Sequence, residues 1–387
     1  MIIKILLGLL ILFIVILSHE FGHFIIAKMN GIRVVEFAIG MGPKLLKFGK
    51  KDTIYTIRLL PIGGACIFDQ EDGYEASLSA KAKLGSEEQL LTEEEMQIQE
   101  TSVQEEQESA PLQVKGKAFT EAPILARLTT VLAGPIFNFL LAWVMAIFIV
   151  LLAGSTNTKI TGLIEDYPAM QAGVQVGDEI ISLNGERVYI YDEVSLFSQL
   201  NEGDTVEMKV NRGGEIVTLT IQPKYSEEEG RYYIGFTGGQ VREKDILSVL
   251  SGAYYEVRYW IKMTIKSLIM LFTGKASVND MAGPVGVATI VSDVYDQASA
   301  FGFLTVVASM LNIAILLSAN LGVINLLPIP AMDGGRILFL LIELVRGKPI
   351  PKEKEAIVHF IGFVLLMMLM VFVFYNDFAR LFARCSG

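Results

Sequence analysis

The chain has 387 residues, a net charge of −10 at neutral pH and 52% hydrophobic residues. Its mean hydropathy of +0.47 argues against an ordinary soluble globular protein and favours a membrane protein. The acidic balance gives no sign of a nucleic-acid partner, and two cysteines provide no disulfide framework.

The first apolar stretch, residues 1–27, is long enough to span a bilayer and contains His19, Glu20 and His23 near its end. A cleaved signal peptide is the alternative, but no small-residue cleavage site follows, so we expect the segment to be retained. Two histidines four residues apart share one face of a helix and can bind one metal ion, with Glu20 beside them as a proton acceptor. Ionisable groups are costly in hydrocarbon, so this cluster indicates chemistry rather than helix packing alone.

Residues 28–70 carry the signals of strands and turns. Residues 54–59 alternate in polarity, and several glycines mark turns on either side. Residues 71–120 differ sharply, because 87–108 hold nine glutamates and no basic residue. Such a composition cannot bury enough apolar surface to fold alone, so we expect a flexible insert, either a solvated spacer or a docking segment.

A second uncharged span is predicted at residues 128–153, with Asn138 inside it. Residues 156–238 resemble a single PDZ domain, since 162–185 reads as a strand, a short helix and a second strand ending at an Asn-Gly turn. In the permuted bacterial form of this domain the last strand carries the carboxylate-binding loop. The residues whose composition suits that loop are Tyr233, Ile234, Gly235 and Phe236.

An amphipathic helix and a linker are expected at residues 245–297, on the outer face of the membrane. The third predicted span, 301–335, ends in a stretch with two prolines that cannot continue a helix and should unwind the chain at membrane depth. The first charge after the apolar stretch of this span is Asp333, a candidate for the third protein ligand that a zinc site needs. A fourth span is predicted at 357–376.

The distribution of basic residues predicts how the spans are oriented. The loops after spans one and three hold most of them, which places both loops in the cytoplasm and the PDZ domain outside. The basic residues near the membrane in these loops are Lys28, Arg33, Lys44, Lys47, Lys50, Lys51, Arg58, Arg336, Arg346, Lys348, Lys352 and Lys354.

The sequence contains two motifs that occur together in a known family. They are His-Glu-x-x-His in the first span and Asn-x-x-Pro-x-Pro-x-x-Asp-Gly-Gly from Asn325 onward. With both motifs, the chain resembles the site-2 protease family of intramembrane zinc proteases. The branch that it resembles more closely is the bacterial regulator of sigma-E protease. The resemblance implies that His19, His23 and Asp333 bind one zinc ion, that Glu20 is the catalytic base and that Asn325 stabilises the oxyanion. Further matching stretches are residues 37–43, 60–64, 133–138 and 281–286.

The fold class implied is a multi-pass α-helical membrane protein with four transmembrane helices, a membrane-associated β-hairpin region and one extracytoplasmic PDZ domain. The activity implied is that of a zinc metalloendopeptidase in the bacterial cytoplasmic membrane, with its active site toward the cytoplasm. Its substrates would be single-span membrane proteins such as anti-sigma factors, or signal-peptide remnants, cut within or near the transmembrane segment after an upstream site-1 protease has acted.

A transmembrane substrate must unwind before it is cut, and an extended segment binds well at the edge of a sheet. We expect contacts from Gly40, Gly42, Tyr55 and Ile57. Asn138 either contacts the substrate backbone or joins helices. The PDZ domain either binds a new C-terminus or acts as a size filter; we favour the filter, because no strong specificity pocket can be recognised.

Two other functions are compatible with parts of the sequence. A non-catalytic membrane scaffold could use the PDZ domain alone, but such a protein would be expected to lack Glu20 or a metal ligand. A transporter could also contain broken helices with charges, but no internal inverted repeat is visible.

Overall fold

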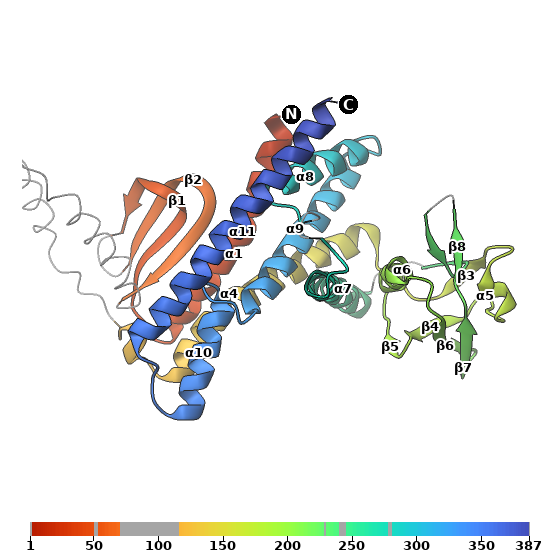
Figure 1. The fold of residues 1–387 in the computed structure, drawn as a ribbon, viewed down its shortest axis with the longest axis horizontal. Coiled ribbons are helices and arrows are strands. Elements are labelled where there is room, and N and C mark those ends of the chain that lie inside the picture. The colour runs from red at the N-terminus through yellow and green to blue at the C-terminus, as the bar shows by residue number, and fades with distance from the viewer. Residues whose placement is uncertain are drawn as a thin grey trace, which may run out of the picture. The chain divides into compact units, whose positions relative to one another are not determined.

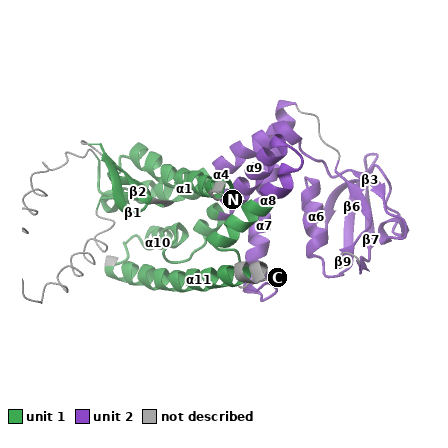
Figure 2. Ribbon diagram, turned by 90° about the horizontal axis from the view of Figure 1, so that it is seen from above, with its two compact units in different colours: residues 1–138, 278–293, 321–387 green, residues 139–277, 294–320 purple. Residues whose placement is uncertain are grey.

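The computed structural model describes residues 2–49, 53–69, 116–227, 230–239, 245–277 and 281–386 (Figure 1). The acidic insert expected at 71–120 lies outside the described residues as far as residue 115. The chain forms two compact units, coloured separately in Figure 2. The first comprises residues 1–138, 278–293 and 321–387, and the second comprises residues 139–277 and 294–320.

Among the described residues, four helices are long and apolar enough to span a membrane. Each overlaps one of the four predicted spans. The third helix ends at Leu326, before the predicted end at 335, because the last part of that span is the broken segment and the start of another helix. The largest difference is at the fourth, which continues beyond the apolar stretch at both ends. These helices are α1 (Ile2–Met29), α4 (Ile124–Ala153), α9 (Phe303–Leu326) and α11 (Lys352–Ser386).

The β region of the first unit is more elaborate than a simple hairpin. It has two long strands, β1 (Val34–Phe48) and β2 (Ile54–Phe68), and each of them bends once. Phe37 pairs with both Tyr55 and Cys66, and Tyr55 also pairs with Phe48, so the two strands form four rows. The rows follow the order 44–48, 54–58, 34–39 and 64–68.

Glycine makes the bends possible, and one carboxylate holds the rows together. Gly40 and Gly42 have positive φ angles of 88° and 91° at the bend of β1, a backbone region that glycine adopts without strain. Burial alone would raise the pKa of Glu36, but hydrogen bonds from Lys44, Thr56 and Arg58 hold it below its ordinary value. The single Glu36 side chain thus connects three of the four rows.

Two shorter helices that begin in the first unit were not predicted as separate elements. They are α10 (Asp333–Arg346) and α8 (Pro284–Ser299), and a 3-10 turn, η1 (Phe119–Glu121), precedes α4. Helix α10 packs Leu340 and Ile337 into a cluster with Ala27 of α1 and Val131 of α4. Arg127 of α4 also pairs with Glu343 of α10, with Nη1 and Oε2 3.1 Å apart. Helix α10 is therefore held against α1 and α4 by its middle and its C-terminal half.

The PDZ domain predicted at 156–238 has the expected elements. A strand, a short helix and a second strand come first, and a hairpin follows at the predicted position. The elements are β3 (Ile160–Leu163), α5 (Pro168–Gln171), β4 (Glu179–Leu183), β5 (Glu186–Arg187), α6 (Tyr191–Leu200), β6 (Val206–Arg212), β7 (Glu215–Ile221), β8 (Lys224–Ser226), β9 (Arg231–Tyr233) and β10 (Phe236–Gly238).

The core of this domain lies between its helices and a four-stranded sheet of order β5-β4-β6-β7. Strand β10 pairs with β3, and β8 pairs with β9. Alternate residues of β6, such as Val206, Met208 and Val210, are fully buried, as expected for a strand with one face toward the core. The domain therefore has a hydrophobic core of its own.

The amphipathic helix predicted after the domain is α7 (Ile246–Phe272). Its basic residues bind the acidic side chains of the PDZ domain. Arg258 pairs with the buried Glu193 at the start of α6, and Lys262 and Lys266 each lie 2.9 Å from Glu186. The sequence alone did not predict these pairs.

Candidate metal centre

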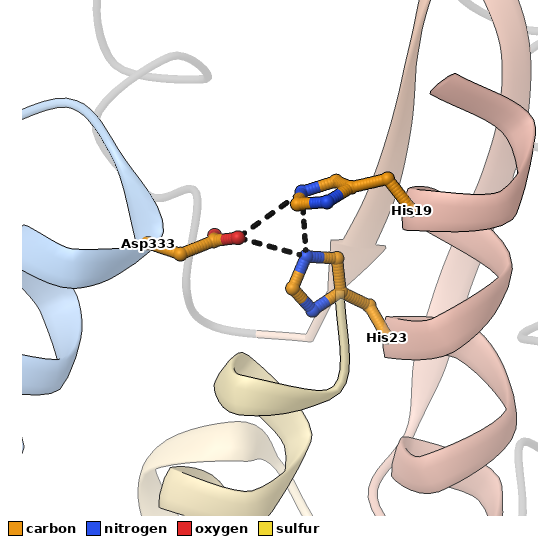
Figure 3. Close-up of side chains that lie close together, drawn as sticks. All are labelled: His19, His23 and Asp333. Atoms are coloured by element: carbon orange, nitrogen blue, oxygen red, sulfur yellow. Dashed lines mark hydrogen bonds and ion pairs between the residues drawn. The ribbon is translucent and has the colours of Figure 1, made fainter. Parts of the chain in front are cut away.

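Two helices of the first unit bring together the three predicted metal ligands. His19 and His23 lie one turn apart on α1, and Asp333 is the first residue of α10. Figure 3 shows the Asp333 carboxylate facing both imidazole rings. Its Oδ2 lies 3.1 Å from His19 Nε2 and 3.3 Å from His23 Nε2, and the two Nε2 atoms are 3.2 Å apart.

These distances fit a metal ion. Tetrahedral zinc with ligands at 2.0–2.1 Å places neighbouring ligand atoms about 3.3 Å apart. Asp333 Oδ2 is buried, and no hydrogen bond from the described residues satisfies it. Among the described residues, His19, His23 and Asp333 are the one group of histidine, cysteine and carboxylate side chains placed to hold a metal. Two imidazoles and a carboxylate suit zinc and leave a fourth position open.

The outer ring nitrogens of both histidines contact α4. His23 Nδ1 lies 2.9 Å from the carbonyl oxygen of Thr130, so Nδ1 carries the proton and Nε2 keeps its lone pair. His19 Nδ1 lies 3.2 Å from the side-chain amide of the fully buried Asn138. The amide atom at this distance is Nδ2. Turning the amide by 180° brings its oxygen to the same place, where it accepts the Nδ1 proton and leaves Nε2 free for a metal.

Glycine allows α1 and α4 to approach closely at this point. A Cβ atom on Gly22 would stand 2.5 Å from the carbonyl oxygen of Ala133, and one on Gly134 would stand 2.7 Å from His19 Cε1. Both distances are shorter than a side chain can tolerate. Gly134 lies in the matching stretch 133–138, but neither glycine was predicted to have a structural role. The two glycines allow the imidazoles to rest against the α4 backbone.

The two predicted catalytic side chains border the same centre. The Asn325 amide nitrogen, near the end of α9, lies 3.4 Å from His19 Nε2. Glu20 follows His19 on α1 and lines a small hollow with Ala38, Ile39 and Gly64 of the bent strands. A Cβ on Gly64 would lie 2.8 Å from Glu20 Cγ, so a glycine is needed beside this carboxylate.

The other predicted binding residues lie in two different places. Gly40 and Gly42 form the bend of β1. Tyr55 packs its ring against Phe24 of α1, with centroids 6.0 Å apart, and Ile57 pairs with Ile39. The residues of the predicted carboxylate-binding loop, which all lie in the PDZ domain around β9 and β10, are Tyr233, Ile234, Gly235 and Phe236.

The carbonyl groups of that loop are bonded within the domain. Ile234 is buried, and its oxygen accepts a hydrogen bond from Ala169 at 2.9 Å. Gly235, with φ at +99°, accepts one from Ile164 at 3.0 Å. The Phe236 oxygen receives the hydroxyl of Tyr191, the first residue of α6, at 3.4 Å.

Comparisons with known proteins agree with this centre. The model of peptidase family M50 matches residues 7–369. The regulator of sigma-W protease RasP of Bacillus subtilis is 34% identical and aligns over 94% of this chain and 95% of its own. The zinc metalloprotease RasP of Geobacillus kaustophilus is also 34% identical and aligns over 94% of this chain and 95% of its own. The probable protease eep of Enterococcus faecalis is 35% identical, over 95% and 97%.

Solved structures match a smaller part of the chain. The PDZ domain of the SdrC-like protein from Listeria monocytogenes is 21% identical, with a TM-score of 0.20, and the match covers 22% of this chain and 87% of that one. The match to the M50 model and to relatives over nearly their full length agrees with the histidine, glutamate and aspartate motifs and with the geometry of the centre. The chain therefore belongs to peptidase family M50, the site-2 protease family of membrane zinc metalloproteases.

Proposed function

We propose that this chain binds one zinc ion through His19, His23 and Asp333 and hydrolyses peptide bonds within or beside transmembrane segments of other membrane proteins. The observation that carries the proposal is the convergence of three ligand atoms within 3.3 Å of one another, from residues more than 300 positions apart in the chain. Zinc at this position supplies a Lewis acid and a water molecule of lowered pKa.

The neighbouring side chains provide the other catalytic functions. Glu20 accepts the proton of the attacking water and passes it to the leaving amine. Asn325, whose amide nitrogen borders the metal ligands, donates a hydrogen bond to the developing oxyanion. Asn138 keeps the His19 ring in the orientation and tautomer that metal binding requires.

The bent sheet is the proposed binding surface for the unwound substrate. Its outer row, 64–68, begins beside Glu20. An extended peptide that pairs with this edge would pass close to the catalytic carboxylate, and backbone pairing would fit many side-chain sequences. Within the same sheet, Gly40 and Gly42 shape the bend, while Tyr55 and Ile57 lie in the central row.

The proposed substrates are single-span membrane proteins. One relative is named for regulating sigma-W, which supports anti-sigma factors as the first class of substrate. Signal-peptide remnants are the second class proposed. Cleavage would follow trimming by an upstream site-1 protease. The distribution of basic residues supports a bacterial cytoplasmic membrane location with the metal centre toward the cytoplasm and the PDZ domain outside.

The PDZ domain acts in this proposal as a size filter. In PDZ domains a bound peptide adds to the strand that follows the carboxylate-binding loop. Here the Tyr191 ring covers that strand, because a Cβ on Gly238 would stand 2.5 Å from Tyr191 Cε2 and the Tyr191 hydroxyl bonds to Phe236. This contact supports exclusion of bulky substrates over capture of a C-terminus.

The central test compares the wild type with Glu20→Gln in detergent, each with and without a chelator, on a single-span test substrate. Gln keeps the size of the side chain but cannot accept a proton. We expect equal zinc content in both proteins, cleavage by the wild type alone, and loss of that cleavage with chelator. Equal cleavage by both proteins would show that Glu20 is not the base. A wild type that binds zinc but does not cut a trimmed substrate would favour the scaffold function.

A further inference from the structure

The third histidine of the chain, His359, contacts the broken segment that leads to the metal centre. The break consists of residues 327–332, between α9 and α10, and includes two prolines, which have no N–H group. Within it, Ile329 donates to Leu327 at 2.7 Å, and Met332 donates to Ile329 at 3.2 Å. The N–H of Ala331 instead donates a hydrogen bond to a residue outside the segment, Nδ1 of His359 on α11, at 2.9 Å.

Ala331 has an unusual backbone conformation. Its φ angle is +73°, in the left-handed region, where a residue with a Cβ atom is strained. Such a conformation persists only where the surroundings hold it. Asp333 follows two residues later, so the direction in which its carboxylate points depends on this turn.

Helix α11 holds the turn at two adjacent residues. His359 binds Ala331, and one turn later Gly362 packs against Pro330, where a Cβ would lie 2.7 Å from the Pro330 carbonyl oxygen. The His359 ring is itself fixed from the other side by Phe339 of α10, with centroids 5.4 Å apart. Because Nδ1 accepts the Ala331 proton, the ring has only one tautomer that fits when it is neutral, with the proton on Nε2.

We propose that His359 is a positioning residue for the zinc centre: its Nδ1 holds Ala331 in the left-handed turn that aims Asp333 at His19 and His23. The inference rests on the proposed function, since it assigns Asp333 as a ligand. His359 does not touch the metal or the substrate and acts only through the backbone of the break.

The chain offers a matched pair of substitutions. In His359→Asn the side-chain oxygen can occupy the position of Nδ1 and accept the same hydrogen bond. In His359→Gln the amide reaches the position of Nε2 instead, so the Ala331 N–H loses its acceptor. A third substitution, Ala331→Gly, removes the strain, because glycine adopts a positive φ without a supporting hydrogen bond.

The experiment uses the full-length protein in detergent and measures zinc affinity by competition with a chelator, together with kcat and KM on the test substrate. We expect His359→Gln to weaken zinc binding about tenfold, the usual effect of one lost hydrogen bond or orienting contact. At subsaturating zinc its kcat should fall while KM stays constant. His359→Asn should recover most of the zinc affinity and most of the kcat. In an Ala331→Gly background, His359→Gln should reduce the zinc affinity clearly less than it does in the wild type.

Several results would overturn the inference. His359 does not act through this hydrogen bond if His359→Gln leaves the zinc affinity unchanged, or if His359→Asn and His359→Gln lower it equally. The same follows if His359→Gln lowers the zinc affinity as much in the Ala331→Gly background as in the wild type. If His359→Gln does not fold, the backbone amide of Ala331 can be replaced by an ester, which deletes the N–H alone; unchanged zinc affinity would again refute the proposal. A wild type that fails to bind zinc would refute the proposed function itself.

Discussion

His19 and His23 use their two ring nitrogens for different purposes. Each Nδ1 contacts α4, and each Nε2 faces Asp333. The α4 contacts fix the rings before a metal arrives, which lowers the entropy that ordering two side chains would otherwise cost on binding. The centre therefore depends on how closely α4 can approach α1, and this approach depends on Gly134.

Gly134→Ala tests this dependence. The added methyl group would stand 2.7 Å from His19 Cε1 and closer still to His23, so both rings must move. We expect zinc affinity to fall roughly 10–100-fold, the range for disturbed support of metal ligands. Competition with a chelator on the purified protein measures this zinc affinity. Gly8→Ala is the control in α1, because its Cβ would meet Val291 at an ordinary 3.7 Å. Equal affinities in the two variants would contradict this account.

Among the elements, α8 and α11 are joined by a single carboxylate. Asp377 of α11 is 4% exposed and accepts hydrogen bonds from the N–H groups of Gly283, at 3.2 Å, and Gly286, at 2.8 Å, at the start of α8. The first turn of a helix has N–H groups without partners inside the helix, and a carboxylate is well suited to bind them. This contact gives a physical reason for the glycines in the matching stretch 281–286.

Asp377→Leu should destabilise this junction. The change leaves one buried and one partly buried N–H group without an acceptor, at a cost of roughly 1–3 kcal/mol for the buried one and less for the other. Asp377→Asn keeps one acceptor oxygen and should lose about half as much. Thermal unfolding in detergent measures both variants against the wild type. If the leucine variant unfolds at the temperature of the wild type, the carboxylate does not hold α8.

The elements also show what can be predicted from sequence. The four spans are predictable because each is a long apolar run with few charges or none. The pairing of His19 and His23 is predictable because helical spacing alone places them on one face. Helix α10 was not predicted, since its 14 residues are too few to span a membrane and its packing depends on Ala27 and Val131, which lie far away in the chain. The four rows of the bent sheet likewise depend on pairings such as Phe37 with Cys66, which no local pattern encodes.

For the whole molecule, Asp333 separates what the sequence predicts from what only the folded chain shows. Its proposed role as a ligand was predicted from two prolines and a lone carboxylate at the end of an apolar stretch, together with the resemblance to a protease family. The aim of its carboxylate depends on Ala331 and His359, a contact across 28 residues that only the folded chain reveals. The PDZ domain is similar: its strands follow from local pattern, whereas the contact of Tyr191 with Phe236 had to be seen in the structure.

The proposed filter function of the PDZ domain predicts that the size of a substrate, and not its C-terminus, controls cleavage by the full-length protein. The Tyr191 hydroxyl donates a hydrogen bond to the Phe236 carbonyl oxygen. Burial raises the pKa of Tyr191, so the hydroxyl stays protonated and remains a donor. Two trimmed test substrates, one ending in a free carboxylate and one in a carboxamide, should therefore have equal kcat/KM values. A third, fused to a folded outer domain, should be cut much more slowly. A loss of about tenfold or more on amidation, the scale of a charge-assisted hydrogen bond, would instead show that the domain captures C-termini.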